Sequence, residues 1–372
     1  MSGDPARAQL DVAVLDWMRE PAWRTEETDG ARFEALALDA FAFQFEHCAP
    51  YRGFCERRGR TPSSVRSWSD VPTVPTGAFK ELALTSFPLA DAVHVFRTSG
   101  TSIATRGALH LDTLALYEAS LLPTFRRLLL PDLGPDARIR LEVLAASPDE
   151  APDSSLSHMF GVALRALGSR RSAFAVQGGT LDVDATLARL ERDIADEEPV
   201  LLCGTAFGFA HLLEALARRG VGLALPAASR AMETGGFKGR ARVLPRTELY
   251  AGIEARLGIP ARRVVNQYGM TELGSQFYDS VLSDPGGERR KLGPPWARVR
   301  ILDPETGAAA AEGAVGVIAV FDLANTGSVC AIQTADLGRR LADGFEIQGR
   351  AEGAEARGCS IAADEMLAGS TP

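Results

Sequence analysis

A run of hydroxyl residues, glycine and arginine near residue 100 has the composition of an anion-binding loop. It reads Thr98-Ser99-Gly100-Thr101-Ser102-Ile103-Ala104-Thr105-Arg106-Gly107. Glycine lets the backbone approach a ligand closely, successive N–H groups in such a turn form a concave anion site, and hydroxyls add uncharged donors. The guanidinium of Arg106 can grip a phosphate oxygen in fork geometry. We interpret the run as a phosphate-binding loop, for which a polar surface turn is the alternative.

An aromatic ring, a hydroxyl and a carboxylate stand close together farther along the chain, in Tyr268-Gly269-Met270-Thr271-Glu272. The face of Tyr268 can stack on a nucleobase, and Thr271 can bond to a phosphate. Glu272 can hold a Mg²⁺ ion that bridges phosphate oxygens. Such a segment alone is more often an ordinary strand-to-turn connection, but together with the hydroxyl-rich run it indicates a nucleotide site.

Alternating strands and helices are predicted around both motifs. The alternation of residues 92–96 predicts a strand before the hydroxyl-rich run, and the helical period of residues 112–130 predicts a helix after it, in the order strand, loop, helix. Further strands are expected at residues 139–144, 199–204 and 264–265, and further helices at residues 181–194 and 207–219, the last ending at Gly220. This order favours an α/β fold with mostly parallel sheets covered by helices.

The two ends of the chain have different patterns. Residues 1–60 carry apolar residues at helical spacing, and residues 61–81 form a connector interrupted by prolines. Beyond Trp296, short strands at residues 298–302, 315–321 and 344–347 are separated by turn signals and predict a small β-rich subdomain of meander or barrel type. We expect an α/β core with a helical N-terminal region over residues 1–290, and a β-rich subdomain with a short tail over residues 291–372.

Composition excludes several classes of function. The 372-residue chain has a formal net charge of −8, which argues against a protein that binds nucleic acid by neutralising phosphates. No stretch approaches about 20 consecutive apolar residues, so we expect no membrane span. The sequence does not begin with an apolar run of signal-peptide length. The five cysteines are widely spaced and form no C-x-x-C pair, as expected for free thiols in the cytoplasm and not for structural zinc.

The motifs stand in the order found in adenylate-forming enzymes, the superfamily of acyl-CoA synthetases and adenylation domains. Residues 99–107 resemble the phosphate loop of that superfamily, Ser-Gly-Thr-Thr/Ser-Gly-x-Pro-Lys-Gly, and residues 268–272 resemble its aromatic-Gly-x-Thr-Glu motif. Three more segments match in order: Gly235-Gly236 a glycine pair beside adenine, Thr334-Ala335-Asp336 the ribose-binding Thr-Gly-Asp, and Gly349-Arg350-Ala351-Glu352 the Gly-Arg-x-Asp hinge. The resemblance implies the α/β core of that superfamily.

Within the superfamily the chain resembles the LuxE-type acyl-protein synthetases, the fatty-acid ligase component of bacterial luminescence. The similar segments are Val71-Pro72-Thr73-Val74-Pro75, the Arg97-Thr98-Ser99-Gly100-Thr101 form of the loop, and Arg357-Gly358-Cys359-Ser360. The resemblance implies that ATP activates a carboxylic acid, a fatty acid in that group, and that the acyl group passes to Cys359 and then to a partner such as a reductase. It also implies that the large mobile C-terminal lid of the superfamily is absent.

The resemblance assigns a role to each matched residue. The phosphates of ATP would be cradled by Thr98, Ser99, Gly100, Thr101 and Ser102, with Arg106 beside them. Thr271 would touch the α-phosphate and Glu272 would hold Mg²⁺. The nucleoside contacts would be Gly235, Gly236, Tyr268, Asp336 and Arg350, with Asp336 on the ribose hydroxyls. Cys359 would carry the acyl group, and the other four cysteines would be packing residues.

Two other functions stay open at this level. An acyl-CoA ligase of the phenylacetate-CoA-ligase type would use CoA as the acyl acceptor and would not need Cys359. A non-catalytic protein that keeps the fold to bind a nucleotide, or to assemble a complex, is favoured by the departures of the loop from the superfamily pattern. The retention of Glu272, Thr271 and Asp336 counts against this third function.

Overall fold

Two compact units make up the chain. The computed structural model describes residues 4–21, 23, 26–99, 106–235 and 245–350. Residues 1–124, 269–276 and 291–372 form the first unit, and residues 125–268 and 277–290 form the second. This division differs from the predicted boundary at residue 290, because the N-terminal helices group with the C-terminal strands and not with the parallel sheet.

The N-terminal part of the first unit is helical, as residues 1–60 predict. Its helical segments are α1 (Pro5–Met18), α2 (Glu26–His47), α3 (Ala49–Arg57), η1 (Trp68–Asp70), α4 (Ala78–Glu81) and η2 (Leu89–Asp91). Helix α1 begins at the capping residue Asp4, whose carboxylate accepts the N–H groups of residues 6 and 7, and Pro5 occupies the first helical position. Trp17 of α1 and Phe33 of α2 then meet edge to face, with ring centroids 6.5 Å apart.

A meander of antiparallel strands forms the C-terminal part of the first unit. Its strands are β13 (Ala297–Leu302), β14 (Val315–Asp322), β15 (Ala331–Leu341) and β16 (Gly344–Arg350), each paired with the next, and η6 (Leu323–Asn325) follows β14. Strand β12 (Lys291–Leu292) pairs with β16, and β1 (Val74–Pro75) from the proline-rich connector pairs in parallel with β15. The predicted β-rich region is confirmed as a meander.

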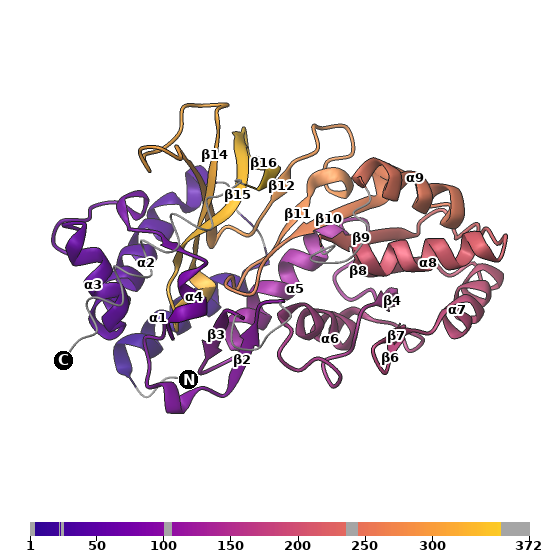
Figure 1. Ribbon diagram of the computed structural model, residues 1–372, viewed down its shortest axis with the longest axis horizontal. Coiled ribbons are helices and arrows are strands. Elements are labelled where there is room, and N and C mark those ends of the chain that lie inside the picture. The colour runs from indigo at the N-terminus through magenta and orange to yellow at the C-terminus, as the bar shows by residue number, and fades with distance from the viewer. Residues whose placement is uncertain (1–3, 22, 24–25, 100–105, 236–244, 351–372) are drawn as a thin grey trace. The chain divides into compact units, whose positions relative to one another are not determined.

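The N-terminal helices pack on this meander, and Figure 1 shows the indigo helices beside the orange and yellow strands. Phe33 on α2 contacts Phe321 on β14, with ring centroids 5.8 Å apart. Gln44, also on α2, donates from its amide nitrogen to the carbonyl of Asn325 at 3.0 Å. Apolar and polar contacts therefore join residues from the two ends of the chain in one core.

The hydroxyl-rich run connects the two strands of a hairpin. Strand β2 (His94–Arg97) precedes it, strand β3 (Ala108–Leu111) follows it, and the two pair antiparallel with Arg97 opposite Ala108. The predicted order strand, loop, helix is wrong here, because β3 intervenes before helix α5 (Ala115–Leu129). The short alternation of residues 108–111 buries Leu109 and Leu111, which is enough to hold a strand on the hairpin.

The second unit is built on parallel strands. They are β4 (Arg140–Leu144), β5 (Ala173–Phe174), β8 (Val200–Thr205), β9 (Arg230–Thr234), β10 (Val264–Tyr268) and β11 (Phe277–Asp279). Strands β5, β4, β8, β9 and β10 are parallel neighbours in that order, and β11 is antiparallel to β10. A small hairpin, β6 (Val176–Gln177) and β7 (Thr180–Leu181), lies outside this sheet. The predicted mostly parallel sheet is confirmed.

Helices connect the parallel strands, as Figure 1 shows for α8 and α9. The helical segments of this unit are α6 (Ser155–Leu167), α7 (Val183–Ala195), α8 (Ala206–Arg218), α9 (Arg246–Leu257), η4 (Ala261–Arg263) and η5 (Ser280–Leu282). The predicted end of α8 at Gly220 is confirmed, since Gly220 has φ +67° and its N–H bonds to the carbonyl of Ala217. The next N–H, of Val221, bonds to the carbonyl of Leu216 and completes the helix-ending motif.

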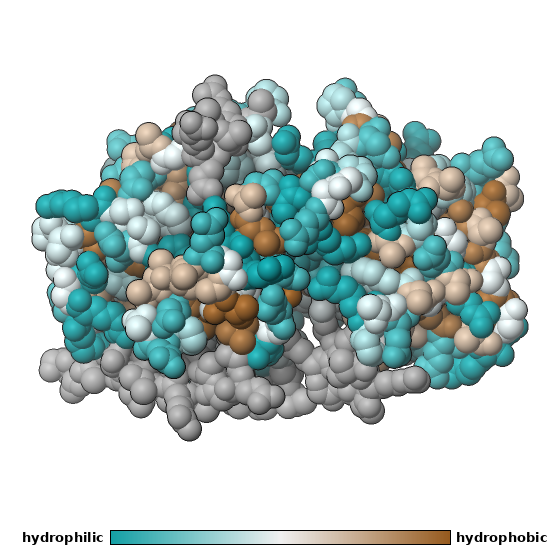
Figure 2. Space-filling model, turned by 90° about the horizontal axis from the view of Figure 1, so that it is seen from above, coloured by the Kyte–Doolittle hydropathy of each residue, from teal (hydrophilic) through white to brown (hydrophobic). Residues whose placement is uncertain are grey.

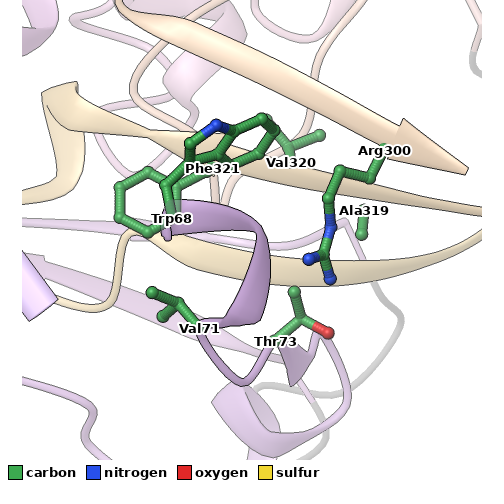
Figure 3. Close-up of a pocket in the computed structure, with 7 residues that line it drawn as sticks. All are labelled: Trp68, Val71, Thr73, Arg300, Ala319, Val320 and Phe321. Carbon is green, nitrogen blue, oxygen red and sulfur yellow. The ribbon is translucent and has the colours of Figure 1, made fainter. Parts of the chain in front are cut away.

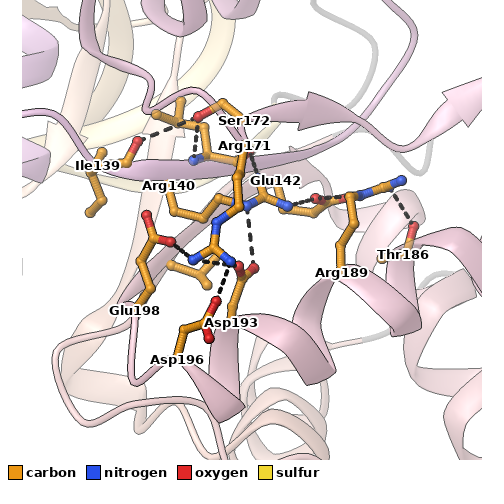
Figure 4. A network of polar contacts seen from close by, with 12 residues as sticks. Ile139, Arg140, Glu142, Arg171, Ser172, Thr186, Arg189, Asp193, Asp196 and Glu198 are labelled. Carbon is orange, nitrogen blue, oxygen red and sulfur yellow. Dashed lines mark hydrogen bonds and ion pairs between the residues drawn. The ribbon is translucent and has the colours of Figure 1, made fainter.

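A buried network of charges surrounds strand β4 of the second unit (Figure 4). Arg140 lies 2.5 Å from Glu142 and 3.2 Å from Asp193, and all three side chains are buried. Arg189 on α7 reaches the other oxygen of Glu142 at 2.5 Å. Burial raises the pKa of Asp193, and the charges of Arg140 and Arg171 oppose that shift. The network ties β4 to α7, and none of its residues belongs to a predicted site.

The molecular surface mixes polar and apolar side chains. On the face drawn in Figure 2, hydrophobic areas are small and separated by hydrophilic ones. The large hydrophobic side chains that are exposed in the described part of the chain are Val12, Leu89, Val93 and Val315. None of the helices described combines the length and the apolar character that crossing a bilayer requires.

Candidate functional site

The hydroxyl-rich run leaves and rejoins its hairpin through a narrow neck. The N–H of Thr98 donates to the carbonyl of Gly107 at 2.9 Å, and the N–H of Gly107 donates back to Thr98 Oγ1 at 2.8 Å. Glycine is favoured at position 107, since a Cβ atom there would lie 3.2 Å from Thr98 Cγ2. Ser99, the first residue beyond the neck, is exposed. These two hydrogen bonds therefore fix Thr98 and Gly107, the residues at the two ends of the loop, next to each other.

Arg106 also belongs to this neck. Its Nε donates to the carbonyl of Thr98 at 2.5 Å and its Nη2 donates to the carbonyl of Arg97 at 3.4 Å. We expected the guanidinium of Arg106 to bind a phosphate. In the structure its Nε and Nη2 atoms instead bind backbone carbonyls at the start of the loop. A guanidinium held there still places a positive charge beside the hydroxyl-rich run, which favours an anionic ligand.

The two motifs of the first unit meet at one backbone group. Thr271 Oγ1 donates to the carbonyl oxygen of Arg97 at 3.4 Å, although the two residues are 174 positions apart. Arg97 ends β2 and directly precedes the hydroxyl-rich run. The fold therefore places the Thr271 hydroxyl beside Arg97, the residue that precedes the hydroxyl-rich run.

The turn that carries Glu272 is held by a loop that sequence reasoning missed. Asn325 Nδ2 donates to the backbone carbonyl of Glu272 at 2.7 Å. Gly274 approaches the same loop so closely that a Cβ atom there would lie 2.7 Å from Ala324 Cβ. Glu272 itself is only 6% exposed. The one sequence feature that could have indicated this loop is the polar stretch of residues 325–328, which directly follows an apolar strand and its turn.

Asp322, at the end of β14, anchors the other side of the same turn. Its Oδ2 accepts the N–H of Ser275 at 2.8 Å, and its Oδ1 accepts the Ser275 hydroxyl at 2.7 Å. Burial raises the pKa of the Asp322 carboxyl, and hydrogen bonds, first that from the Ser275 hydroxyl, oppose the shift. Ser275 and Ser120 on α5 share a 2.8 Å hydrogen bond, and Trp296 Nε1 donates to Ser120 Oγ at 2.8 Å. Buried groups therefore hold this turn on both sides.

The predicted ribose residue and the predicted hinge residue are partners on neighbouring strands. Asp336 on β15 pairs in register with Arg350 on β16, and Asp336 Oδ1 lies 3.3 Å from Arg350 Nε. The Thr334 hydroxyl donates to the carbonyl of Ile318 at 2.8 Å and accepts the N–H of Asp336 at 3.1 Å. These bonds order the segment and leave the Asp336 carboxylate partly exposed, where it can accept hydrogen bonds from sugar hydroxyls.

The predicted adenine residues that the structure describes lie in the second unit. Tyr268 is the last residue of β10, and Gly235 directly follows the last residue of β9. Strands β9 and β10 are parallel neighbours, with Thr234 opposite Gln267. Gly235 and Tyr268 therefore lie at the same edge of the sheet, where the carboxyl ends of parallel strands bind ligands in α/β proteins.

A buried carboxylate supports this edge of the sheet, and sequence reasoning assigned it no role. Glu233 Oε1 accepts hydrogen bonds from Asn266 Nδ2 at 2.7 Å and from the Tyr250 hydroxyl at 2.9 Å. The backbone N–H of Asn266 in turn donates to Asp279 Oδ2 at 3.0 Å. Burial, and next the charge of Glu233, raise the pKa of Tyr250, so its hydroxyl stays a donor at neutral pH.

Several predicted site residues lie outside the described part of the chain, and their roles stay predictions. They are Gly100, Thr101, Ser102, Gly236 and Cys359. Of the others, the fold gathers Thr98, Arg106 and Thr271 around the carbonyl of Arg97. Asp336 and Arg350 form a second group in the same unit, and Gly235 and Tyr268 share a sheet edge in the other unit.

The four described cysteines are packing residues, as expected. Cys48, Cys55, Cys203 and Cys330 are all buried. Burial raises the pKa of Cys48 to about 11 and that of Cys55 to about 12, and it raises the pKa values of Cys203 and Cys330 as well. A nucleophilic cysteine needs an accessible thiolate, so none of these four side chains is suited to that role.

The described residues do not form a ready-made cage for Mg²⁺. No three His, Cys, Asp or Glu side chains gather in this part of the chain in a way that would hold a metal ion. Mg²⁺ in nucleotide sites is usually held by one or two carboxylates together with phosphate oxygens and water. Glu272, next to the residue that contacts the loop entry, fits this pattern when a nucleotide supplies the remaining ligands.

A separate hollow in the first unit contains none of the predicted site residues (Figure 3). It is lined by Trp68, Val71, Thr73, Arg300, Ala319, Val320 and Phe321. The guanidinium of Arg300 lies 5.9 Å from the centre of the Trp68 ring, and burial lowers the pKa of Arg300. The hollow is a packing feature between residues 68–73 and strands β13 and β14.

Comparison with known protein families identifies relatives along almost the entire chain. The family model described as "Acyl-protein synthetase, LuxE" matches residues 6–368. The long-chain-fatty-acid–luciferin-component ligase of Aliivibrio fischeri is 22% identical over 89% of this chain and 85% of its own length. The ligase of the same name from Vibrio harveyi is 23% identical over the same shares of the two chains.

Two solved structures of a CoA ligase have the same fold as this chain. An open conformation of 2-hydroxyisobutyryl-CoA ligase, in complex with 2-HIB-AMP and CoA, superposes with a TM-score of 0.62 at 15% identity, over 85% of this chain and 74% of that one. The postadenylation state of this ligase, in complex with 2-HIB-AMP, gives a TM-score of 0.61 at 16% identity, over 87% and 68% of the two chains. The α/β fold expected from the motifs is confirmed.

Proposed function

Because the chain belongs to the LuxE family of acyl-protein synthetases, we propose that it is a ligase that uses ATP to activate a carboxylic acid and then carries the acyl group on its own cysteine. The observation that most directly supports nucleotide use is the hydrogen bond from the Thr271 hydroxyl to the carbonyl of Arg97. It brings two motifs that are far apart in sequence to one point, as a shared phosphate site requires.

The first step is adenylation. A carboxylate oxygen of the acid attacks the α-phosphorus of ATP, the bond to the β-phosphate oxygen breaks, and pyrophosphate leaves with the electron pair. Thr98 and Arg106 at the loop neck and Thr271 beside it would orient the phosphates, because this reaction depends on positioning and charge neutralisation. Glu272 would hold Mg²⁺, which when bound neutralises charge on the phosphate oxygens.

The nucleoside contacts would be the residues that the matched motifs supply. Asp336 would accept hydrogen bonds from the ribose hydroxyls, with Arg350 beside it as a cation. Gly235 and Tyr268, at one edge of the parallel sheet, would border the adenine ring, with the Tyr268 face available for stacking.

The second step is acyl transfer. The thiolate of Cys359 attacks the acyl carbon of the acyl-adenylate, a thioester forms, and AMP leaves with the electrons of the mixed-anhydride bond. The burial of the four other cysteines, with pKa values raised by it, supports Cys359 as the acceptor. The names of the relatives support a long-chain fatty acid as the substrate, and an acyl-accepting partner protein such as a reductase would then take the acyl group.

The experiment that tests this proposal measures whether a labelled acyl group becomes attached to the protein. The chain is incubated with ATP, Mg²⁺ and radiolabelled carboxylic acids of different chain lengths, and the products are separated on a denaturing gel with and without hydroxylamine. We expect a hydroxylamine-labile label on the protein that disappears in Cys359→Ser. The matched control Cys330→Ser, in which a buried thiol is replaced, should keep the label.

Other outcomes would separate the alternatives. Acid-dependent exchange of pyrophosphate into ATP with no protein label, and thioester only after CoA is added, would indicate an acyl-CoA ligase. Absence of both exchange and label with every acid, for a chain that still binds ATP, would indicate a non-catalytic nucleotide-binding protein.

A further inference from the structure

We propose that Asn325 is a positioning residue for the Thr271–Glu272 turn and that Gln44, on helix α2, holds Asn325 in place. The inference rests on the proposed function, because it assumes that Glu272 faces the metal and the phosphates of ATP. It assigns a role to the loop after β14 and to the N-terminal helical region, neither of which belongs to the matched motifs.

The first link joins Asn325 to the turn. Asn325 Nδ2 donates to the backbone carbonyl of Glu272 at 2.7 Å, and both residues are buried, at 2% and 6% exposure. A buried carbonyl that loses its hydrogen-bond donor is left without a partner, which is unfavourable, so the peptide group turns toward another donor. The bond therefore selects one orientation of the peptide group from which the Glu272 side chain extends.

The second link joins Asn325 to helix α2. Gln44 Nε2 donates to the carbonyls of Asn325 at 3.0 Å and Thr326 at 3.2 Å, while Gln44 Oε1 accepts the N–H of Cys330 at 3.0 Å. Gln44 is 1% exposed, so water cannot replace these bonds without opening the core. Both ends of the Gln44 amide are used, and the loop of residues 325–330 is fixed to the helix.

The third link fixes the far side of the turn. Asp322 accepts both the N–H and the hydroxyl of Ser275. Together with the Asn325 bond at Glu272, it encloses Gly274, whose missing Cβ lets the turn sit against Ala324. The turn is thus held at two points, and Asn325 holds the one at Glu272.

The chemical consequence concerns geometry and not charge. Groups that orient a metal-binding or phosphate-binding side chain from behind typically change metal affinity 10- to 100-fold when they are removed. Loss of the Asn325 donor would not remove the carboxylate of Glu272 or the hydroxyl of Thr271. It would allow both groups to take up other orientations. We therefore expect loss of affinity for the metal–nucleotide complex rather than loss of the fold.

The test uses the full chain with Asn325→Leu, which keeps the side-chain shape and removes the donor, and Gln44→Leu, which removes the support. Asn325→Ser is the second variant at that position, in case the leucine variant does not fold. The matched control is Ser86→Ala: the Ser86 hydroxyl is buried and donates to the Thr326 carbonyl at 2.9 Å, so this variant disturbs the same loop but leaves the Glu272 bond intact.

Two readouts are compared. The first is hydrogen–deuterium exchange of residues 270–276 without nucleotide or metal. The second is calorimetric affinity for a non-hydrolysable ATP analogue, measured with and without Mn²⁺ as the metal probe. We expect Asn325→Leu to increase exchange in this segment and to weaken metal-dependent binding about 10-fold or more. Ser86→Ala should leave both unchanged.

The outcomes distinguish this inference from the proposed function. If the wild-type chain binds the analogue but the Asn325 variants match it in both exchange and affinity, the positioning role is excluded while nucleotide binding stands. If the wild-type chain binds no nucleotide, the proposed function fails, and the positioning role that depends on it fails as well.

Discussion

Asp336 and Arg350 face each other across strands β15 and β16, with Asp336 Oδ1 3.3 Å from Arg350 Nε. Gly349, the residue before Arg350, has φ +142°, a conformation that only glycine adopts readily. The two residues that the sequence assigns to ribose binding and to the hinge are therefore direct partners. The ion pair places a carboxylate and a cation together at the end of the described chain.

The first prediction concerns this pair. We expect Asp336→Asn to raise KM for ATP about tenfold or more, because a charged acceptor for the ribose hydroxyls is lost. The effect on the free energy of unfolding should stay below about 1 kcal/mol, since the pair is partly exposed. Pyrophosphate–ATP exchange at varied ATP concentration and urea unfolding measure the two quantities.

The matched control for this prediction lies on the same strands. Arg339 and Glu346 also pair across β15 and β16, with a 2.6 Å contact, and Glu346 is more exposed than Asp336, at 39% against 18%. Glu346→Gln should break that ion pair and leave KM for ATP unchanged. An equal rise in KM for both variants would show that any disturbance of the two strands has the effect, and the ribose role of Asp336 would be rejected.

The second prediction concerns the turn that carries Glu272. A Cβ atom on Gly274 would lie 2.7 Å from Ala324 Cβ and 3.2 Å from the backbone carbon of Ala324, so the turn must shift in Gly274→Ala. Overpacking of this kind typically costs about 1–3 kcal/mol. We expect lower stability and a loss of adenylation rate, measured by urea unfolding and by pyrophosphate exchange.

Gly134→Ala is the control, because nothing lies within 4 Å of a Cβ atom at that position. It should behave like the wild type in both measurements. Normal adenylation in Gly274→Ala would show that close contact with residue 324 is not needed for the site.

The third prediction concerns the thiols. Cys48, Cys55, Cys203 and Cys330 are buried, which raises their pKa values and blocks access, so they should resist iodoacetamide at pH 8 in the native chain. Mass spectrometry of peptides should show alkylation at these four positions only after unfolding in guanidinium chloride. Rapid labelling of any of them in the native chain would contradict the packing described for the first or the second unit.

The fourth prediction concerns pH. Burial, and next the charge of Arg97, lower the pKa of His110 below its usual value of 6.5. The unfolded chain therefore binds more protons than the folded chain just below pH 6.5, and stability falls as pH decreases through this range toward the lowered pKa. Above pH 6.5 the contribution of His110 is fully present.

In His110→Gln we expect the free energy of unfolding to decrease less steeply between pH 6.5 and pH 5 than in the wild type. Urea unfolding at a series of pH values measures the slope, and His211→Gln on α8 controls for the loss of a histidine elsewhere. An unchanged slope in His110→Gln would refute the assignment.

Local periodicity predicted most of the fold. The parallel strands of the second unit are short apolar runs between helices, and the meander is marked by turns, so both patterns can be recognised within a few residues. Strand β3 was missed because only residues 108–111 form it and a strong helical pattern begins directly afterwards. The grouping of the helices with the meander has no local signal, since it depends on contacts such as that of Phe33 with Phe321.

The candidate site was predictable only where a motif carries it. Thr98, Thr271 and Asp336 stand in recognisable sequence motifs, and a hydrogen bond joins Thr271 of the second motif to Arg97, the residue before Thr98. Asn325 and Asp322 stand in no such motif. Their importance comes from tertiary hydrogen bonds to the Glu272 turn, which the sequence alone does not encode in any short pattern.

The joining of the two chain ends in one core has a consequence for synthesis on the ribosome. The Gln44 partner at residue 325 lies 281 positions later, which at about 5–20 residues per second is a delay of about 15–60 s. During that time helices α1 and α2 have emerged without the meander that covers their apolar faces. The second unit consists mostly of one continuous stretch, so the delay between synthesis of its first and last residues is shorter. Vectorial synthesis therefore favours folding of the second unit first, and the apolar faces of the N-terminal helices stay uncovered until the last strands are made.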